Sequence, residues 1–243
     1  MFFQRLDNVL VQHGICSKRS VKNFIQNNNI CINQTRVFDS KIYVNEQNDS
    51  IFVNNRKIES NHLYLMLNKP AGYVCSTVSD RSAIVYQLLD EYKNHPLFNK
   101  IHSVGRLDKE TEGLLLFTTN GNFSNYITKK ENDITKKYYV ELEIKVTKEE
   151  QKEIAEKFNK GIFIPKENKF DSFLSKPAII EWIADNSCNI TITEGKFHQV
   201  RRMFSAIKNN VTYLKRIAIG NLYLNDLSPS ETKILTKEEI DLI

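Results

Sequence analysis

Apolar residues in the first 60 positions recur first at helical and then at strand spacing. Residues 6–10 follow helical spacing, and the dipeptide His13-Gly14 predicts the end of that helix. Ser17 is the expected N-cap of a second helix, whose apolar residues lie between positions 21 and 25. Short strands are predicted at residues 30–32, 41–44 and 51–53, and the polar residues 54–62 form the expected linker. This pattern predicts a small αα-then-β unit.

From residue 63 onward the pattern changes to longer β-rich segments that are interrupted by helices. Capping boxes predict helix starts after Thr147 and Thr236, because each threonine is followed three residues later by a glutamate. Strands outnumber helices and alternate with them irregularly. This favours an α+β fold with a mixed, largely antiparallel sheet and flanking helices over a doubly wound parallel sheet. We therefore expect two domains, residues 1–60 and 61–243. The strands predicted in the second domain span residues 63–67, 114–118, 138–146, 178–183, 189–193 and 211–213.

The composition argues against several classes of protein. The chain has 243 residues, of which 41% are hydrophobic and 26% charged, as in globular proteins. No apolar run approaches the ~18 residues that a membrane-spanning helix needs. The four cysteines form no C-x-x-C pair, which argues against a zinc ribbon and for free thiols in a reducing cytoplasm. The histidines lack metal-ligand spacing and the glycines lack a phosphate-loop or dinucleotide motif, so we expect neither a metal nor a cofactor.

Positive charge is concentrated in two segments of the chain. The formal net charge of the whole chain is +5, whereas residues 1–41 alone carry +4 and residues 194–216 alone carry +5. Two basic patches on an otherwise near-neutral chain are typical of a polyanion-binding protein, although two solvated surfaces explain the same charges. The basic residues of the first segment are Arg5, Lys18, Arg19, Lys22, Arg36 and Lys41, and those of the second are Lys196, Arg201, Arg202, Lys208, Lys215 and Arg216.

The segment 104–116 contains the strongest candidate for chemistry. Its motif Gly105-Arg106-Leu107-Asp108 is followed by Gly113 and by an apolar strand. Such a loop exposes its side chains at the edge of a rigid sheet, where functional sites tend to lie. A loop aspartate most often accepts hydrogen bonds in a turn. The functional alternative is a carboxylate nucleophile, which needs no activating base because it is ionised at neutral pH.

A second segment, residues 194–207, supports the functional alternative. As a helix it has an apolar side and an opposite side that contains His198, Arg201 and Arg202. An arginine at this place is able to pair bidentately with a loop carboxylate and to keep the pKa of that carboxylate low. Two adjacent arginines are explained equally well by a solvated surface.

Ordered motifs along nearly the whole chain resemble those of the bacterial rRNA pseudouridine synthases that carry an N-terminal S4 domain, the group that includes the 16S rRNA enzyme. Residues 105–114 resemble the catalytic motif G-R-L-D-x-x-T-x-G-L, and residues 5–21 resemble the S4 RNA-binding module. Residues 68–74 resemble N-K-P-x-G-x-V, residues 136–140 resemble K-x-Y-x-V, and residues 194–203 resemble E-G-x-x-x-Q-V-[KR]-R-M.

The resemblance implies a role for each matching residue. Asp108 corresponds to the catalytic aspartate, and Arg106 to the arginine that replaces the flipped base in the RNA stack. Tyr138 corresponds to the tyrosine that stacks on the target base and takes its proton, Arg201 to the basic residue paired with the aspartate, and Ile192 to an aliphatic contact with the base. Tyr138 and Ile192 are otherwise ordinary core-strand residues. Further expected RNA contacts are Lys69, His198, Arg202, Arg5, Lys18, Arg19 and Lys22.

The resemblance also implies an activity, the isomerisation of one uridine of 16S rRNA to pseudouridine. We expect a monomeric cytoplasmic enzyme that acts on a partly assembled small subunit, without a cofactor, a metal or a membrane partner. A 23S rRNA uridine is the second candidate target. A non-catalytic S4-domain ribosome-assembly factor is the alternative from another class, and the presence of Asp108, Arg106, Tyr138 and Arg201 argues against it. An RNA hydrolase would need metal ligands or a catalytic histidine pair, which the sequence pattern does not offer.

Overall fold

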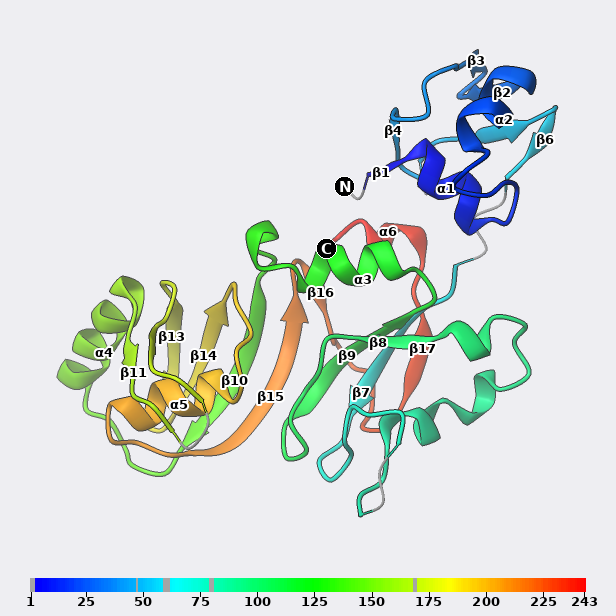
Figure 1. Ribbon diagram of the computed structural model, residues 1–243. Coiled ribbons are helices and arrows are strands. Elements are labelled where there is room, and N and C mark those ends of the chain that lie inside the picture. The colour runs from blue at the N-terminus through cyan, green and yellow to red at the C-terminus, as the bar shows by residue number, and fades with distance from the viewer. Residues whose placement is uncertain (1–2, 47, 59–61, 79–80, 168–169) are drawn as a thin grey trace. The chain divides into compact units, whose positions relative to one another are not determined.

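The chain divides into two compact units, Met1–His62 and Leu63–Ile243. The computed structural model describes residues 3–46, 48–58, 62–78, 81–167 and 170–243 (Figure 1). The predicted domain boundary after residue 60 falls within residues 59–61, which lie outside the described residues. That the first unit is an S4-type RNA-binding domain stays a prediction.

The N-terminal unit consists of two short helices and short antiparallel strands around one apolar cluster. Strand β1 (Gln4–Arg5) pairs with β4 (Tyr43–Val44). A four-stranded sheet has the order β3-β2-β5-β6. The helices α1 (Leu6–Gln12) and α2 (Val21–Asn27) bury their apolar sides in this cluster, as their spacing predicts. The strands of the sheet are β2 (Ile30–Ile32), β3 (Thr35–Arg36), β5 (Ile51–Val53) and β6 (Arg56–Lys57).

Three local predictions for this unit differ from the structure. Helix α2 begins at Val21, because the amide of Ser20 donates to the Ser17 hydroxyl at 3.2 Å and Ser17 therefore closes a turn that precedes the helix. The predicted strand 41–44 is formed only at Tyr43–Val44, where β1 supplies a partner. The predicted linker 54–62 begins with a turn and strand β6, which pairs with β5.

The larger unit is built on one nine-stranded sheet. Its main path has the order β13-β14-β10-β15-β9-β7-β17, with β16 beside β15 and β8 beside β9. Among the described strands, only β15 and β9 run parallel, so the prediction of a mixed, largely antiparallel sheet is confirmed. The strands are β7 (Tyr64–Lys69), β8 (His102–Val104), β9 (Glu112–Thr118), β10 (Lys136–Leu142), β13 (Ile179–Ala184), β14 (Ser187–Ile192), β15 (Val211–Ile219), β16 (Leu222–Tyr223) and β17 (Thr232–Ile234). Outside this sheet, β11 (Phe163–Ile164) pairs with β12 (Phe173–Leu174).

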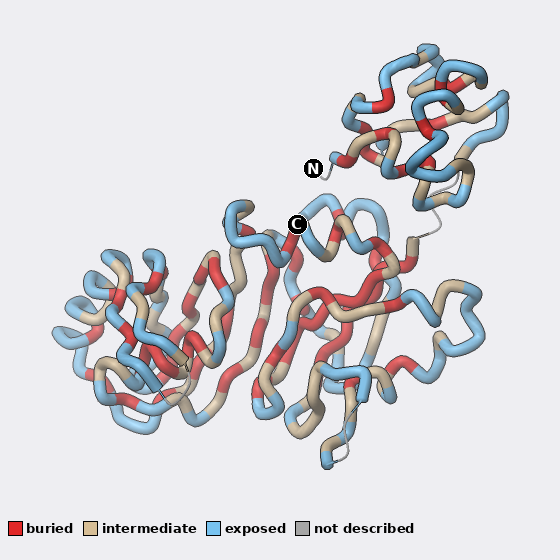
Figure 2. Tube along the Cα trace, viewed as in Figure 1, coloured by how far each residue is buried: buried red, intermediate tan, exposed pale blue. Residues whose placement is uncertain are grey.

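Helices cover both faces of this sheet. Leu65 and Leu67 of β7 enter one apolar cluster, whereas Tyr64 and Met66 enter a second one, as the alternation of a strand requires. Figure 2 shows the resulting run of buried residues along the central strands. Because both faces are packed, the central strands form a rigid support for the loops at their ends. Residues of α4 (Lys148–Lys160) and α5 (Gln199–Ala206) belong to the first cluster, and residues of α3 (Gly121–Thr128) and α6 (Lys237–Ile240) to the second. Short 3₁₀ helices lie at Val85–Tyr92, Phe98–Lys100 and Lys130–Asn132.

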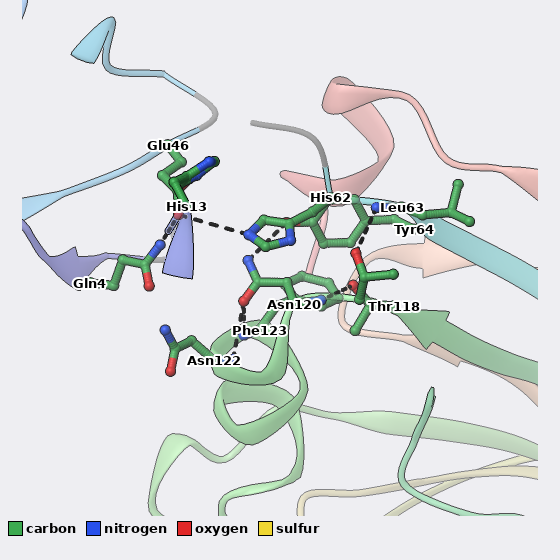
Figure 3. Close-up of polar contacts among 11 residues, drawn as sticks. Gln4, His13, Glu46, His62, Leu63, Tyr64, Thr118, Asn120, Asn122 and Phe123 are labelled. Atoms are coloured by element: carbon green, nitrogen blue, oxygen red, sulfur yellow. Dashed lines mark hydrogen bonds and ion pairs between the residues drawn. The ribbon is translucent and has the colours of Figure 1, made fainter. Parts of the chain in front are cut away.

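Helix starts follow local side-chain chemistry. The capping boxes predicted at Thr147 and Thr236 are present at the starts of α4 and α6. Helix α3 is capped by Asn120, whose side-chain oxygen accepts hydrogen bonds from the amides of Asn122 and Phe123 at 3.0 and 3.1 Å (Figure 3). Within the described ranges, no helix combines the length and the hydropathy that crossing a bilayer would need.

Candidate active site

The loop that carries Asp108 connects β8 to β9 and is fixed by its neighbours. Gly105 begins the loop with φ +70°, a left-handed conformation that glycine adopts without strain. The side chain of Leu107 is buried in the core, and its amide donates to the sulfur of Cys75 at 3.3 Å. The amide of Thr111 donates to the Asp108 carbonyl at 3.1 Å and closes a turn. The backbone is thus held on both sides of Asp108, whose side chain stays 34% exposed.

Lys69 supports the same loop from inside the protein. Its ammonium group donates to the carbonyls of Pro70, Lys109 and Thr111 at 3.0, 3.1 and 2.8 Å. Burial lowers the pKa of Lys69, and the three carbonyls compensate for the desolvation of the charge. Because Lys69 has no exposed surface, the predicted contact of this residue with RNA is wrong. The lysine instead connects the end of β7 to the residues that follow Asp108.

A pocket of about 530 Å³ lies in front of Asp108. This volume is within the range of pockets that bind small organic ligands, and it is large enough for a nucleotide. The structure brings five predicted residues into its lining: Arg106, Asp108, Tyr138, Ile192 and His198. Cations outnumber acids in this lining, which favours a ligand with phosphate groups. The charged lining residues are Arg106, Lys109, Lys130, Lys136, Lys196 and Arg216 against Asp108 and Glu194.

Neighbouring strands place a buried cation, Arg216, and a half-buried one, Lys136, beside Tyr138. Tyr138 on β10 is 8% exposed, and Arg216 lies opposite it on β15. The Arg216 Nε atom donates to the Leu114 carbonyl at 2.7 Å, and its Nη2 atom is buried without a hydrogen-bond partner among the described residues. Burial, and then repulsion by Arg216, lowers the pKa of Lys136 to about 8. Sequence reasoning assigned no site role to Lys136 or Arg216, although one lies in the K-x-Y-x-V segment and the other in the second basic cluster.

The turn before α5 brings His198 to the pocket. The Gln199 side chain donates to Glu194 at 2.6 Å and accepts from the Lys196 amide at 2.9 Å, which fixes the turn. His198 is the N-cap residue and has φ +48°, which is uncommon for a residue other than glycine. Its Nε2 atom lies 3.6 Å from Oδ1 of Asp108. A partly exposed carboxylate, an imidazole and an aromatic strand residue therefore share one cationic pocket.

Residues 63–206 match the family of RNA pseudouridylate synthases. The chain belongs to this family. It is similar to the ribosomal small subunit pseudouridine synthase A of Escherichia coli (strain K12), with 37% identity over 238 residues that cover 97% of this chain and 98% of the relative. An uncharacterized RNA pseudouridine synthase of Bacillus subtilis (strain 168) is 32% identical and covers 98% of both chains. A crystal structure of a pseudouridylate synthase matches with a TM-score of 0.65 at 33% identity, over 98% of this chain and 99% of the other. The family prediction is confirmed.

The structure of this pseudouridine synthase does not show the predicted pairing of Arg201 with Asp108. The Arg201 guanidinium donates to the carbonyl of Val211 at 2.9 Å and to that of Glu110 at 3.5 Å. In the described part of the chain, the ion-pair partner of Asp108 is His198. The helix places Arg201 next to the first residue of β15, whose carbonyl accepts a hydrogen bond from the guanidinium. Arg201 therefore contacts the backbone of the Asp108 loop rather than the carboxylate.

Arg202 has a structural position in this synthase. It is 6% exposed, and its Nη2 atom donates to the carbonyls of Pro165 and Asp171 at 2.8 and 3.2 Å. These bonds hold α5 against the segment between β11 and β12. These contacts give Arg202 a packing role, and its predicted contact with RNA stays a prediction.

The predicted RNA contacts of the N-terminal unit lie on its surface. Lys18, Arg19 and Lys22 are exposed, at and just before the start of α2. Arg5 forms an ion pair with Asp7 at 2.5 Å, and Arg5, Asp7 and Lys18 line a second hollow in this unit. The position of these cations leaves them accessible to a polyanion.

Proposed function

We propose that the protein converts one uridine of 16S rRNA to pseudouridine. The observation that carries the proposal is the partly exposed Asp108 carboxylate beside Tyr138 in a cationic pocket, in a chain that belongs to the pseudouridylate synthase family. The reaction breaks the N1–C1′ bond of the uridine, turns the uracil and joins C5 to C1′. It is redox-neutral, so the chain's own residues suffice to position the base and to assist its departure.

Four of the pocket residues have a defined role in this proposal. Asp108 assists the loss of uracil from C1′, and Tyr138 offers the ring on which the flipped base stacks. Ile192, which is 3% exposed, supplies an apolar contact for the base. Arg106 is exposed and takes the place that the flipped base leaves in the RNA stack. Flipping costs a few kcal/mol, and stacking of one base on an aromatic ring returns roughly 1–3 kcal/mol.

We further propose that the substrate is a partly assembled small subunit and that the enzyme acts as a monomer in the cytoplasm. Support for a small-subunit target comes from the name of the relative with 37% identity over 97% of the chain. The test is to map pseudouridines in both rRNAs of a strain that lacks the gene, by carbodiimide-stop sequencing. Loss of one 16S pseudouridine is the expected result. Loss of a 23S pseudouridine would identify the second candidate target, and no loss at all would favour the non-catalytic assembly factor.

The exposed cations of the N-terminal unit predict a salt-dependent contribution to RNA binding. Replacing Lys18, Arg19 and Lys22 by glutamate is expected to weaken rRNA binding. Each lost phosphate contact should reduce the slope of log K against log salt concentration by about one unit. The matched control is the reversal of three exposed lysines of α4, Lys152, Lys157 and Lys160, which changes the total charge equally. If both variants change the slope by the same amount, the effect comes from net charge and α2 does not face the RNA.

Lys136 predicts a pH dependence of RNA binding. The pKa of Lys136 is about 8 in the free protein, and a nearby RNA phosphate raises this pKa. Above pH 8, Lys136 therefore takes up a proton when RNA binds. The Kd for rRNA is therefore expected to increase between pH 8 and 9.5, by at most about tenfold per pH unit. Lys136→Met should remove this pH dependence. Lys130→Met, which removes an exposed cation of the same pocket, should leave the pH dependence unchanged. A wild-type Kd that stays constant from pH 7 to 9.5 would contradict the prediction.

A further inference from the structure

Three aromatic rings form a stacked column that ends beside Asp108. The centroids of Phe170 and Phe197 are 3.7 Å apart with an interplanar angle of 10°. Phe197 and His198 are also 3.7 Å apart, at 17°. Phe197 therefore has a ring on each of its faces, and the column continues to the imidazole. The His198 side chain is 40% exposed and lines the pocket.

The backbone holds this column in place at an energetic cost. His198 has a left-handed conformation, and the hydrogen bonds of Gln199 to Glu194 and Lys196 fix the turn around it. Residues held in sparsely populated backbone conformations tend to cluster at functional sites. The side chains of Phe197 and His198 also remain partly exposed, although aromatic rings of this size are ordinarily buried where they only support the fold.

We propose that the imidazole of His198 is a stacking platform for the RNA base next to the target uridine, with Phe197 and Phe170 fixing the plane of its ring. The inference rests on the proposed function, since RNA must enter the pocket. The flipped uracil is assigned to Tyr138 and Ile192, which are 8% and 3% exposed. The exposed position of His198 suits a neighbouring base that remains outside the buried part of the pocket. Stacking on an aromatic ring is tolerant of base identity, so the platform contributes affinity and strand placement.

The contact between His198 and Asp108 does not account for the column. The 3.6 Å between Nε2 and Oδ1 exceeds hydrogen-bond distance, and both side chains are more than one-third exposed. Exposed ion pairs contribute little to stability or binding. A counter-charge also needs no aromatic rings behind it, whereas a stacking platform gains rigidity from them.

Three substitutions at position 198 separate stacking from charge. His198→Asn removes the ring but suits the left-handed backbone, and His198→Lys keeps a positive charge. Both are expected to raise KM for the rRNA substrate roughly tenfold, with a much smaller change in kcat. His198→Tyr restores a ring and should return KM to within about threefold of the wild type. Recovery by lysine and not by tyrosine would overturn the proposal in favour of a counter-charge to Asp108.

A modified substrate identifies the base that stacks. An RNA with an abasic nucleotide next to the target uridine should raise the wild-type KM roughly tenfold, while His198→Asn should add no further loss on that RNA. Additive losses would mean that His198 contacts something other than this base. Phe197→Leu should give a weaker version of the same pattern, and Phe163→Ala, an exposed phenylalanine outside the pocket lining, serves as the control. Thermal unfolding of each variant checks that the fold is intact.

The activity of the wild-type enzyme shows whether a negative result contradicts the stacking role of His198 or the proposed function itself. If the wild type forms pseudouridine and His198→Asn binds the intact and abasic RNAs as the wild type does, only the platform fails. If the wild type forms no pseudouridine in any rRNA, the proposed function fails. In that case the stacking role of His198 is still testable by measuring the Kd of the wild type and of the His198 variants for the intact and the abasic RNA. A binding measurement needs no turnover.

Discussion

Replacing Asp108 by asparagine is expected to abolish pseudouridine formation and to leave RNA affinity within a few-fold of the wild type. The change keeps the shape of the side chain and removes only the carboxylate charge. The loop around it is held by Leu107, Lys69 and the turn at Thr111, and none of these contacts uses the Asp108 side chain. Loss of an essential nucleophile typically reduces turnover by about 10⁴-fold or more. A tritium-release assay on 5-tritiated rRNA measures the conversion.

A neighbouring carboxylate provides the control for this variant. Glu110 is exposed, lies in the same loop and is not part of the pocket lining. Glu110→Gln removes the same charge from the loop and is expected to retain activity within a few-fold. Turnover by Asp108→Asn comparable to that of Glu110→Gln would refute the assignment of Asp108 as the catalytic carboxylate.

The main strands of the fold were predictable because their apolar patterns are long. Residues 114–118 read as a strand in the sequence, and the structure extends that strand only to Glu112–Thr118. The prediction for β15 covered only residues 211–213, because Lys215 and Arg216 interrupt the apolar pattern. The strand itself continues to Ile219. Arg216 is tolerated inside because a carbonyl of β9 accepts its Nε hydrogen, a partner that lies about 100 residues away in sequence. Two-residue strands such as β3 and β11 depend on tertiary pairing and leave no periodic signal.

The candidate site was predictable where motif residues converge from one loop and the two neighbouring strands β10 and β14. Asp108, Tyr138 and Ile192 come from separate segments, and the structure places all three in the pocket lining. The partners of the cations were not predictable. Helical spacing locates Arg201 and Arg202 on α5 but does not tell which carbonyls they meet. A lysine such as Lys69 is rarely buried, and only the three carbonyls that surround it in the fold explain its position.

The stability of the site depends on the close approach of two strands at Gly113. This residue has φ +100°, and a Cβ atom there would lie 2.2 Å from the Arg216 carbonyl oxygen and 2.8 Å from its nitrogen. Gly113 and Arg216 are partners in the parallel pairing of β9 with β15. Any side chain at position 113 therefore pushes β15 away from β9. Because Arg216 lies on β15, it would also move away from Tyr138.

Gly113→Ala is accordingly expected to reduce the free energy of unfolding by about 3 kcal/mol or more, since it combines a backbone clash with an unfavourable φ. Urea denaturation measures the change, and activity should fall with it because the pocket loses its buried cation. Gly121→Ala is the matched control. Gly121 starts α3 without a positive φ, and an added Cβ would meet nothing within 4 Å, so alanine there should change stability by no more than about 1 kcal/mol. Equal urea midpoints for the two variants would mean that β15 shifts without cost and that Gly113 does not fix Arg216 at the pocket.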